Sequence, residues 1–215
     1  MEFNFIEDGI DAIVIDNFYN EQQLSEIMDE LKFLTKPSIF CEPKKLAAAT
    51  DDNNNVITSK RGVWVDTVIN WNHSSLIKYP WDNLCIPEVK EKIIGFNSMY
   101  RIMYACDWRS NLLSYYENSD YYDVHHDDAI FTVLNYFHTT PKKFTGGEIK
   151  LYSSTSNKIA TVEVKQNRVV IIPSVTKHEV LEIKSDLKNT FSGDGRYCNS
   201  IFLQKQILKA PNDSN

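Results

Sequence analysis

The second half of the chain is a succession of short strand-like segments separated by turn signals. β-Branched residues are dense there, as in the run Val169-Val170-Ile171-Ile172, while Gly146-Gly147 and Pro173 break up the apolar stretches. We predict strands at residues 101–106, 111–117, 121–126, 130–138, 147–152, 158–165, 168–174, 178–183 and 196–204. So many short strands within about 100 residues favour a sandwich or barrel such as a jelly roll.

The first half is typical of mixed α/β structure that supports such a core. Asn20 is suited to cap a helix in which Gln23 completes a capping box, and apolar residues follow a 3.6-residue period over residues 21–34. The other expected elements are a helix from Pro87 through Ile94, strands at 12–15 and 62–66, and a polar loop at 41–60. The predicted fold class is therefore mainly β with supporting α-helices.

Length and charge limit the organisation and the partners. The 215 residues are most economically one domain, with support at 1–99, a jelly-roll core at 100–204 and a tail at 205–215 that frays over Ala210–Asn215. The net charge of −6 argues against a nucleic-acid-binding surface. No uninterrupted apolar run approaches the roughly 20 residues of a membrane helix.

The cysteines carry information about the compartment. Cys41, Cys85, Cys106 and Cys198 are widely spaced and form no Cys-x-x-Cys pair. Without a signal peptide, this pattern indicates reduced thiols and a cytoplasmic location rather than a disulfide framework.

Four polar residues stand out as candidates for chemistry. His125 and Asp127 are two apart on a predicted strand, so their side chains project to the same face. Taken alone, such a pair more often consists of polar residues on the protein surface than of metal ligands. His126 and Asp128 are also two residues apart, so they form a second, overlapping His-x-Asp match. His178 follows an apolar strand, where a lone histidine is commonly a buried structural side chain. Arg196 begins the last predicted strand and is equally compatible with an ordinary surface arginine.

Together these residues predict a metal-dependent oxygenase. Two imidazoles and one carboxylate are the ligand set of a facial triad, which holds iron(II) on one side and leaves positions open for a co-substrate and dioxygen. An arginine supplies the planar fork that binds a carboxylate through two hydrogen bonds.

The order of the motifs resembles the 2-oxoglutarate/iron(II) dioxygenases of the prolyl 4-hydroxylase-like group over about residues 100–204. The matching segments are Tyr116 to Asp127, Tyr136-Phe137-His138, Gly146-Gly147-Glu148, His178-Glu179-Val180 and Gly195-Arg196-Tyr197. Two departures occur: Ser119 stands where the family usually has glycine, and the His178–Arg196 spacing is lengthened by an insertion around residues 185–194. Within the matching run, the pattern favours His125 and Asp127 over His126 and Asp128.

The resemblance implies a double-stranded β-helix, the jelly-roll fold, and a role for each matching residue. His125, Asp127 and His178 would bind Fe(II), and Arg196 would pair with the distal carboxylate of 2-oxoglutarate. Tyr116 and Tyr136 would hydrogen-bond that co-substrate or else serve as packed aromatics. The implied reaction consumes O2 and releases succinate and CO2, with ascorbate as a supporting reductant.

The substrate follows from the resemblance alone. A prolyl residue of a peptide or protein is the leading expectation, with a free amino acid or another small molecule as alternatives. Nucleic-acid-dealkylating relatives carry a second arginine six residues after the first, and Phe202 stands there in this chain. Loops 41–60 and 185–195 are either lids over the site or solvated surface. A non-catalytic jelly-roll binding module is the alternative from a different class.

Overall fold

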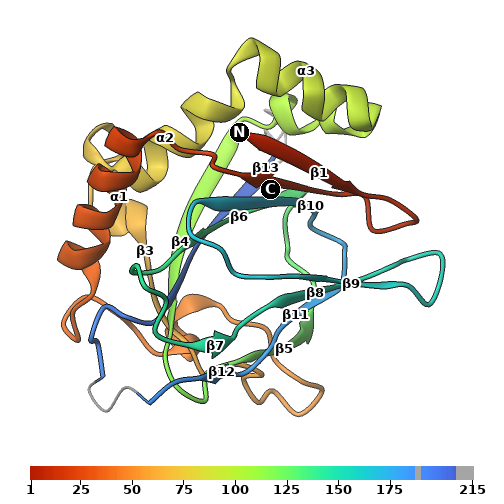
Figure 1. The fold of residues 1–215 in the computed structure, drawn as a ribbon. Helices are drawn as coiled ribbons and strands as arrows, with labels where there is room; N and C mark the ends of the chain where they lie inside the picture. Colours follow the sequence, from red (N-terminus) through yellow and green to blue (C-terminus); the bar gives the residue numbers. More distant parts are fainter. Residues whose placement is uncertain (187–189, 207–215) are drawn as a thin grey trace, which may run out of the picture.

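The computed structural model describes residues 1–186 and 190–206 and contains two facing antiparallel sheets with helices on one side (Figure 1). The larger sheet has seven strands in the order β1-β2-β10-β6-β13-β4-β3, and the smaller has four in the order β5-β11-β8-β9. The strands of the larger sheet are β1 (Glu2–Ile6), β2 (Ala12–Asp16), β3 (Arg61–Trp64), β4 (Trp108–Tyr116), β6 (Phe131–Phe137), β10 (Arg168–Pro173) and β13 (Arg196–Gln204). The others are β5 (Tyr122–His125), β8 (Ile149–Tyr152), β9 (Ile159–Val162), β11 (His178–Val180), and the short pair β7 (Thr145–Gly146) and β12 (Ile183–Lys184).

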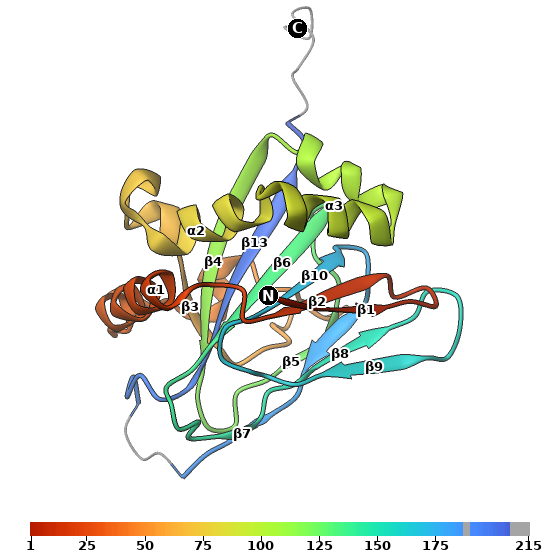
Figure 2. The same cartoon turned by 45° about the horizontal axis from the view of Figure 1, so that its top comes forward.

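This arrangement confirms the predicted mainly β jelly-roll class. The larger sheet also takes strands from the first half of the chain, because β1 and β2 lie at one edge and β3 at the other. Helices lie across the outer face of that sheet, as seen when its top is turned forward (Figure 2). They are α1 (Glu21–Leu34), α2 (Ser75–Leu84) and α3 (Pro87–Phe96), with 3₁₀ turns at Pro43–Leu46, Val65–Thr67, Trp71–His73, Ser98–Arg101 and Met103–Ala105.

Strand alternation divides the interior into two cores. On β10, Val169 and Ile171 face the helices, whereas Val170 and Ile172 face the smaller sheet. A strand buried on both faces is apolar throughout, which explains the unbroken run that the sequence displays. The core between the two sheets also surrounds the site described below.

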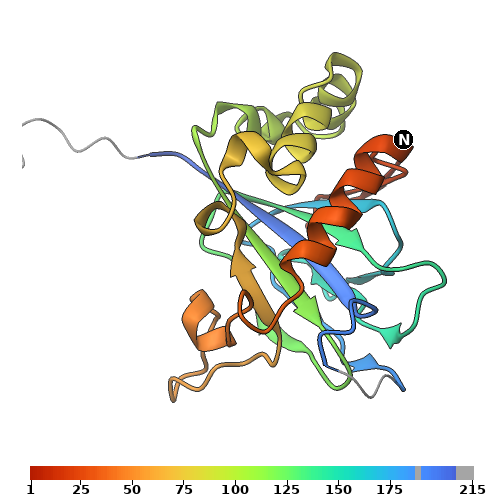
Figure 3. The ribbon, with the colours of Figure 1, turned by 90° about the vertical axis from the view of Figure 1, so that its left-hand side faces the viewer.

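The helix predicted at residues 21–34 is confirmed as α1, and both halves of its capping box form. The Asn20 side chain accepts a hydrogen bond from the Gln23 backbone at 2.9 Å, and Gln23 accepts one from the Asn20 backbone at 3.2 Å. Ile27, Leu31 and Leu34 are buried, so the helix packs along the large sheet (Figure 3). The second predicted helix is confirmed as α3, with Pro87 in its first turn.

Two elements differ from the sequence expectation. The strand predicted at 101–106 is wrong: the backbone forms 3₁₀ turns there, with Ile102 donating to Met99 and Ala105 donating to Ile102. Helix α2 was not predicted, and Pro80 inside it disfavours a helix locally. The carboxylate of Glu30 on α1 offsets this cost by accepting hydrogen bonds from three donors at the start of α2, on Ser74, Ser75 and Leu76.

The predicted tail at 205–215 lies outside the described residues except for positions 205 and 206, so its predicted frayed segment Ala210–Asn215 is not described. Part of the predicted loop at 185–195 also lies outside the described residues. Among the described residues, no helix is both long and apolar enough to cross a membrane.

Candidate active site

Two strands of the smaller sheet bring the predicted histidines together. His125 is the last residue of β5, His178 is the first of β11, and the two are directly paired across the strands. Their ring centroids are 4.3 Å apart. Asp127 follows in the turn after β5, which is fixed where its backbone N–H donates to the carbonyl of Ser174 at 3.0 Å. Chain segments about fifty residues apart thus converge on one point.

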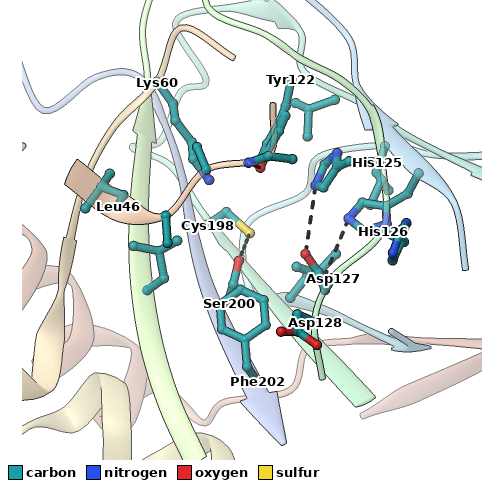
Figure 4. A pocket seen from close by; sticks show the side chains of 18 of the residues that line it. Leu46, Lys60, Tyr122, His125, His126, Asp127, Asp128, Cys198, Ser200 and Phe202 are labelled. Carbon is teal, nitrogen blue, oxygen red and sulfur yellow. Dashed lines mark hydrogen bonds and ion pairs between the residues drawn. The ribbon is translucent and has the colours of Figure 1, made fainter. Parts of the chain in front are cut away.

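The three side chains lie around a common space, where Figure 4 shows His125 and Asp127 pointing toward each other. Nε2 of His125 lies 3.9 Å from one carboxylate oxygen of Asp127, and Nε2 of His178 lies 3.7 Å from the other. These separations are too long for direct hydrogen bonds. One ligand atom from each residue lies within 4.8 Å of the others, and this is the group among the described residues that could hold a metal ion. We call it the His-Asp-His triad.

Backbone carbonyls fix the tautomer of both imidazoles. Nδ1 of His125 lies 2.7 Å from the carbonyl oxygen of Asp123, and Nδ1 of His178 lies 2.9 Å from that of Thr176. A carbonyl only accepts, so each Nδ1 carries the proton and each Nε2 presents its lone pair to the shared space. Burial, assisted by the nearby His178, lowers the pKa of His125 to about 2, which keeps this imidazole neutral. A neutral imidazole facing a carboxylate is the state that binds a cation.

The carboxylate of the triad is oriented by two hydroxyl groups. Thr132 Oγ1 donates to Asp127 Oδ2 at 2.6 Å, and the same hydroxyl lies 2.8 Å from Ser174 Oγ. Both hydroxyl-bearing residues are fully buried, so the aspartate is held against a rigid wall. Sequence reasoning missed these two residues, whose types are common in strands and carry no signal by themselves.

The alternative register does not form a metal site. His126 and Asp128 are exposed, and they line the rim of the cavity rather than joining the triad. The turn after β5 therefore separates the two overlapping His-x-Asp matches, which the sequence alone left open.

A cavity of about 520 Å³ adjoins the triad and contains the predicted arginine. Arg196 is only 1% exposed, and its guanidinium lies between the rings of Tyr116 and Tyr136, at 4.7 and 4.8 Å from their centroids. Among the described residues, Nε and Nη1 of Arg196 and the hydroxyl of Tyr136 have no hydrogen-bond partner. Buried polar groups are normally satisfied, so this cluster fits an anionic ligand that the protein itself does not supply.

The two tyrosines occupy different positions around the arginine. Tyr116 pairs with Arg196 across β4 and β13 and lines the cavity, whereas Tyr136 lies on β6 behind the guanidinium. Burial raises the pKa of both phenols, so both keep their protons and remain hydrogen-bond donors. The Gly-Gly turn makes room for the arginine, since a Cβ on Gly147 would lie 2.9 Å from the Arg196 Cδ.

The loop at 41–60 forms one wall of the cavity. Leu46, Ala47, Ala48 and Ala49 line it, and the backbone N–H of Ala49 donates to the Tyr122 hydroxyl at 2.8 Å. The Tyr122 ring is stacked on His125 with centroids 3.6 Å apart, so the loop is connected to the triad through one side chain. Lys60, at the end of this loop, also faces the cavity, and sequence reasoning missed it.

Two facing antiparallel sheets with a His-Asp-His triad between them define a jelly-roll protein with a group of side chains that could hold a metal ion. The comparisons with known proteins agree with this class: residues 111–198 match the model of the 2OG-Fe(II) oxygenase superfamily. This stretch contains the triad and Arg196. Residues 111–198 are therefore similar in sequence to the superfamily that the motifs predicted.

Solved structures of prolyl hydroxylases share the fold. One from Trichoplax adhaerens, in complex with a hypoxia inducible factor oxygen degradation domain peptide, aligns with a TM-score of 0.63 and 18% identity over 92% of this chain and 84% of that one. A Pseudomonas putida prolyl-4-hydroxylase aligns at 0.55 and 12% over 91% and 93%. A Phytophthora capsici prolyl 4-hydroxylase aligns at 0.56 and 17%, over 97% of this chain but 63% of that one. No curated protein matches the chain in sequence.

Proposed function

We propose that the protein is a 2-oxoglutarate- and Fe(II)-dependent dioxygenase that hydroxylates an aliphatic C–H bond. The observation that carries the proposal is the placement, in one cavity, of the His-Asp-His triad and a buried arginine whose donors are unsatisfied within the described residues. The triad would hold Fe(II), and Arg196 would hold the distal carboxylate of 2-oxoglutarate. When bound, these groups supply the oxidising chemistry, with O2 consumed and succinate and CO2 released.

The chain's own residues position and insulate the reactants. Thr132 fixes the triad carboxylate, and the two backbone carbonyls behind the imidazoles keep both Nε2 lone pairs aimed inward. Tyr116 and Tyr136 would donate hydrogen bonds to the carboxylate that pairs with Arg196. The sheets and the wall formed by the 41–60 loop surround the cavity in part, which strengthens the interaction of its charged groups relative to bulk water.

For the substrate, we propose a prolyl residue of a peptide or protein. The cavity extends from the triad to Trp64 on β3 and Phe202 on β13, whose rings are 5.9 Å apart and partly exposed. An apolar aromatic wall suits a small aliphatic ring better than a polar side chain. The Trichoplax neighbour, of the same fold, was solved with a peptide. Phe202 takes the place where nucleic-acid-dealkylating relatives have an arginine, so we propose no nucleic-acid substrate.

The test is hydroxylation of a proline-containing peptide library by purified protein with Fe(II), 2-oxoglutarate and ascorbate. Mass spectrometry should show the gain of one oxygen on proline, coupled to succinate, with a His178→Ala variant as the inactive control. Oxygen on free amino acids alone would defeat the peptide assignment and leave the dioxygenase standing. Absence of both metal and 2-oxoglutarate binding would instead support a non-catalytic jelly-roll binding module.

We further propose that the protein works in the cytoplasm. All four cysteines are free, and Cys198 is buried in the cavity wall where oxidation would disturb the site. A reducing compartment suits such a chain. Fractionation of the source cells, with immunodetection of the protein, tests this.

A further inference from the structure

Lys60 occupies a position that mirrors Arg196 across strand β4, which lies between β13 and β3. The register pairs Arg196 with Tyr116 on one side of β4, and on the other side Arg61 with Tyr115, so Lys60 lies next to Tyr116. Lys60, Tyr116 and Arg196 all line the cavity. The two cationic side chains therefore come from neighbours of the same strand and enter the same space.

The lysine ammonium is close to both tyrosine rings of the cavity wall. Lys60 Nζ lies 4.6 Å from the ring centroid of Tyr122 and 5.9 Å from that of Tyr116, the same ring that Arg196 approaches to 4.7 Å. Figure 4 shows the Lys60 side chain extending into the cavity between Leu46 and Tyr122. The ring faces stabilise an ammonium in part, but they do not neutralise it.

Within the described part of the chain, no carboxylate forms an ion pair with Lys60. Lys60 is 5% exposed, and no hydrogen bond or ion pair to its Nζ is found within residues 1–186 and 190–206. Burial lowers its pKa to about 8, while Cys198 and Asp127 act in the opposite direction, so the amine is still mainly protonated at pH 7. The Lys60 side chain is largely buried while its ammonium group opens onto the cavity, where an anionic ligand would pair with it.

The cavity thus holds two buried cations, whereas its one partly buried carboxylate, Asp127, belongs to the triad. We propose that Lys60 is a second carboxylate-binding residue, which acts with Arg196 to hold 2-oxoglutarate. The inference rests on the proposed function, and it adds a second cation to the one that Arg196 supplies for the carboxylates of the co-substrate.

The experiment compares Lys60→Met with wild type in the binding of 2-oxoglutarate to protein loaded with Mn(II) in place of iron. Isothermal calorimetry measures both the metal and the ketoacid. We expect 2-oxoglutarate binding to weaken at least tenfold in Lys60→Met, with Lys60→Arg retaining most of the affinity, because an ion pair in a desolvated cavity is lost. Metal affinity should be unchanged or greater, since a positive charge near the triad has been removed.

Lys165→Met is the matched control, because Lys165 is half-exposed beside Asp16 and does not line the cavity. An affinity for 2-oxoglutarate within twofold of wild type in Lys60→Met would overturn the inference, as would an equal loss of metal and ketoacid binding. If Lys60→Met does not fold, Lys60→Gln decides by the same criteria. Wild-type protein that binds Mn(II) but no 2-oxoglutarate would refute the proposed function itself, which separates the two failures.

Discussion

Replacing Arg196 by methionine separates the ligand-binding role of this residue from any structural role. Methionine keeps an unbranched side chain between the Tyr116 and Tyr136 rings but removes the charge and the donor fork. In the free protein, two guanidinium donors have no partner among the described residues. Taking an unpaired charge out of the interior relieves a desolvation cost, which offsets the lost ring contacts of about 0.5–2 kcal/mol each. The ligand-free variant should therefore be at least nearly as stable as wild type.

The cost of the Arg196→Met substitution should appear on binding. Losing a buried charge-assisted pair, with the partner carboxylate left unpaired, costs on the order of 2–5 kcal/mol. At about 1.4 kcal/mol per factor of ten, this weakens 2-oxoglutarate by roughly 30-fold to several thousand-fold. Metal affinity should change little, because the triad that would hold the ion does not include Arg196.

Calorimetric titration of 2-oxoglutarate into Mn(II)-loaded protein measures this difference, and thermal unfolding provides a second readout. A ligand at 100 times its dissociation constant stabilises the native state by about 2.7 kcal/mol. That increment should be seen in wild type and lost in Arg196→Met at the same ligand concentration. Equal 2-oxoglutarate affinities in the two proteins would refute the reasoning, and so would a variant that loses metal and ketoacid together.

Three further predictions follow from contacts around the triad and at the edge of the large sheet. Alanine at any triad position should abolish metal binding measured by atomic emission, whereas His126→Ala should retain it; the opposite pattern would show the wrong register. Thr132→Val should weaken the metal by roughly 10–100-fold while the fold is retained by circular dichroism, because the triad carboxylate loses its donor. Arg168→Met should cost about 1–3 kcal/mol in urea unfolding at pH 7, since Arg168 binds both carboxylate oxygens of Asp16 at 2.5 and 2.6 Å. The hydrogen bond from Arg168 lowers the pKa of Asp16, so this stability is present above the unfolded pKa of about 3.9 and is lost as pH falls through the lower folded value. A difference between variant and wild type that does not shrink as the pH falls below the unfolded pKa would contradict it.

The residues of the triad were predictable from the sequence because their types and their order along the chain are distinctive. His125, Asp127 and His178 are rare side chains in a fixed order, and strand pairing converts that order into proximity. The choice between the two overlapping His-x-Asp matches depends on a turn held by a distant carbonyl, so the residues alone leave it open. The prediction of a strand at 101–106 was wrong for a different reason. There, local backbone hydrogen bonds form 3₁₀ turns and outweigh the β propensity of the side chains.

The position of Lys60 in the cavity could not be predicted from its local sequence. It precedes a short edge strand, and nothing in its local sequence indicates burial. Its place beside Tyr116 and in the cavity with Arg196 is set by the register of three strands, β3, β4 and β13, which pair residues far apart in the chain. Helix α2 illustrates the same point, since Glu30 on a different helix caps its start.

We predict that one cavity binds both Fe(II), which the triad would hold, and 2-oxoglutarate, which Arg196 would hold. Anaerobic addition of both to the purified protein tests it without knowledge of the substrate, by the visible charge-transfer absorption of an iron(II)–ketoacid chelate. We predict that this band appears only when both are present, is lost in His178→Ala, and needs far more 2-oxoglutarate in Arg196→Met. A protein that binds Fe(II) but gives no band at any 2-oxoglutarate concentration, or one whose band survives in His178→Ala, would contradict the account.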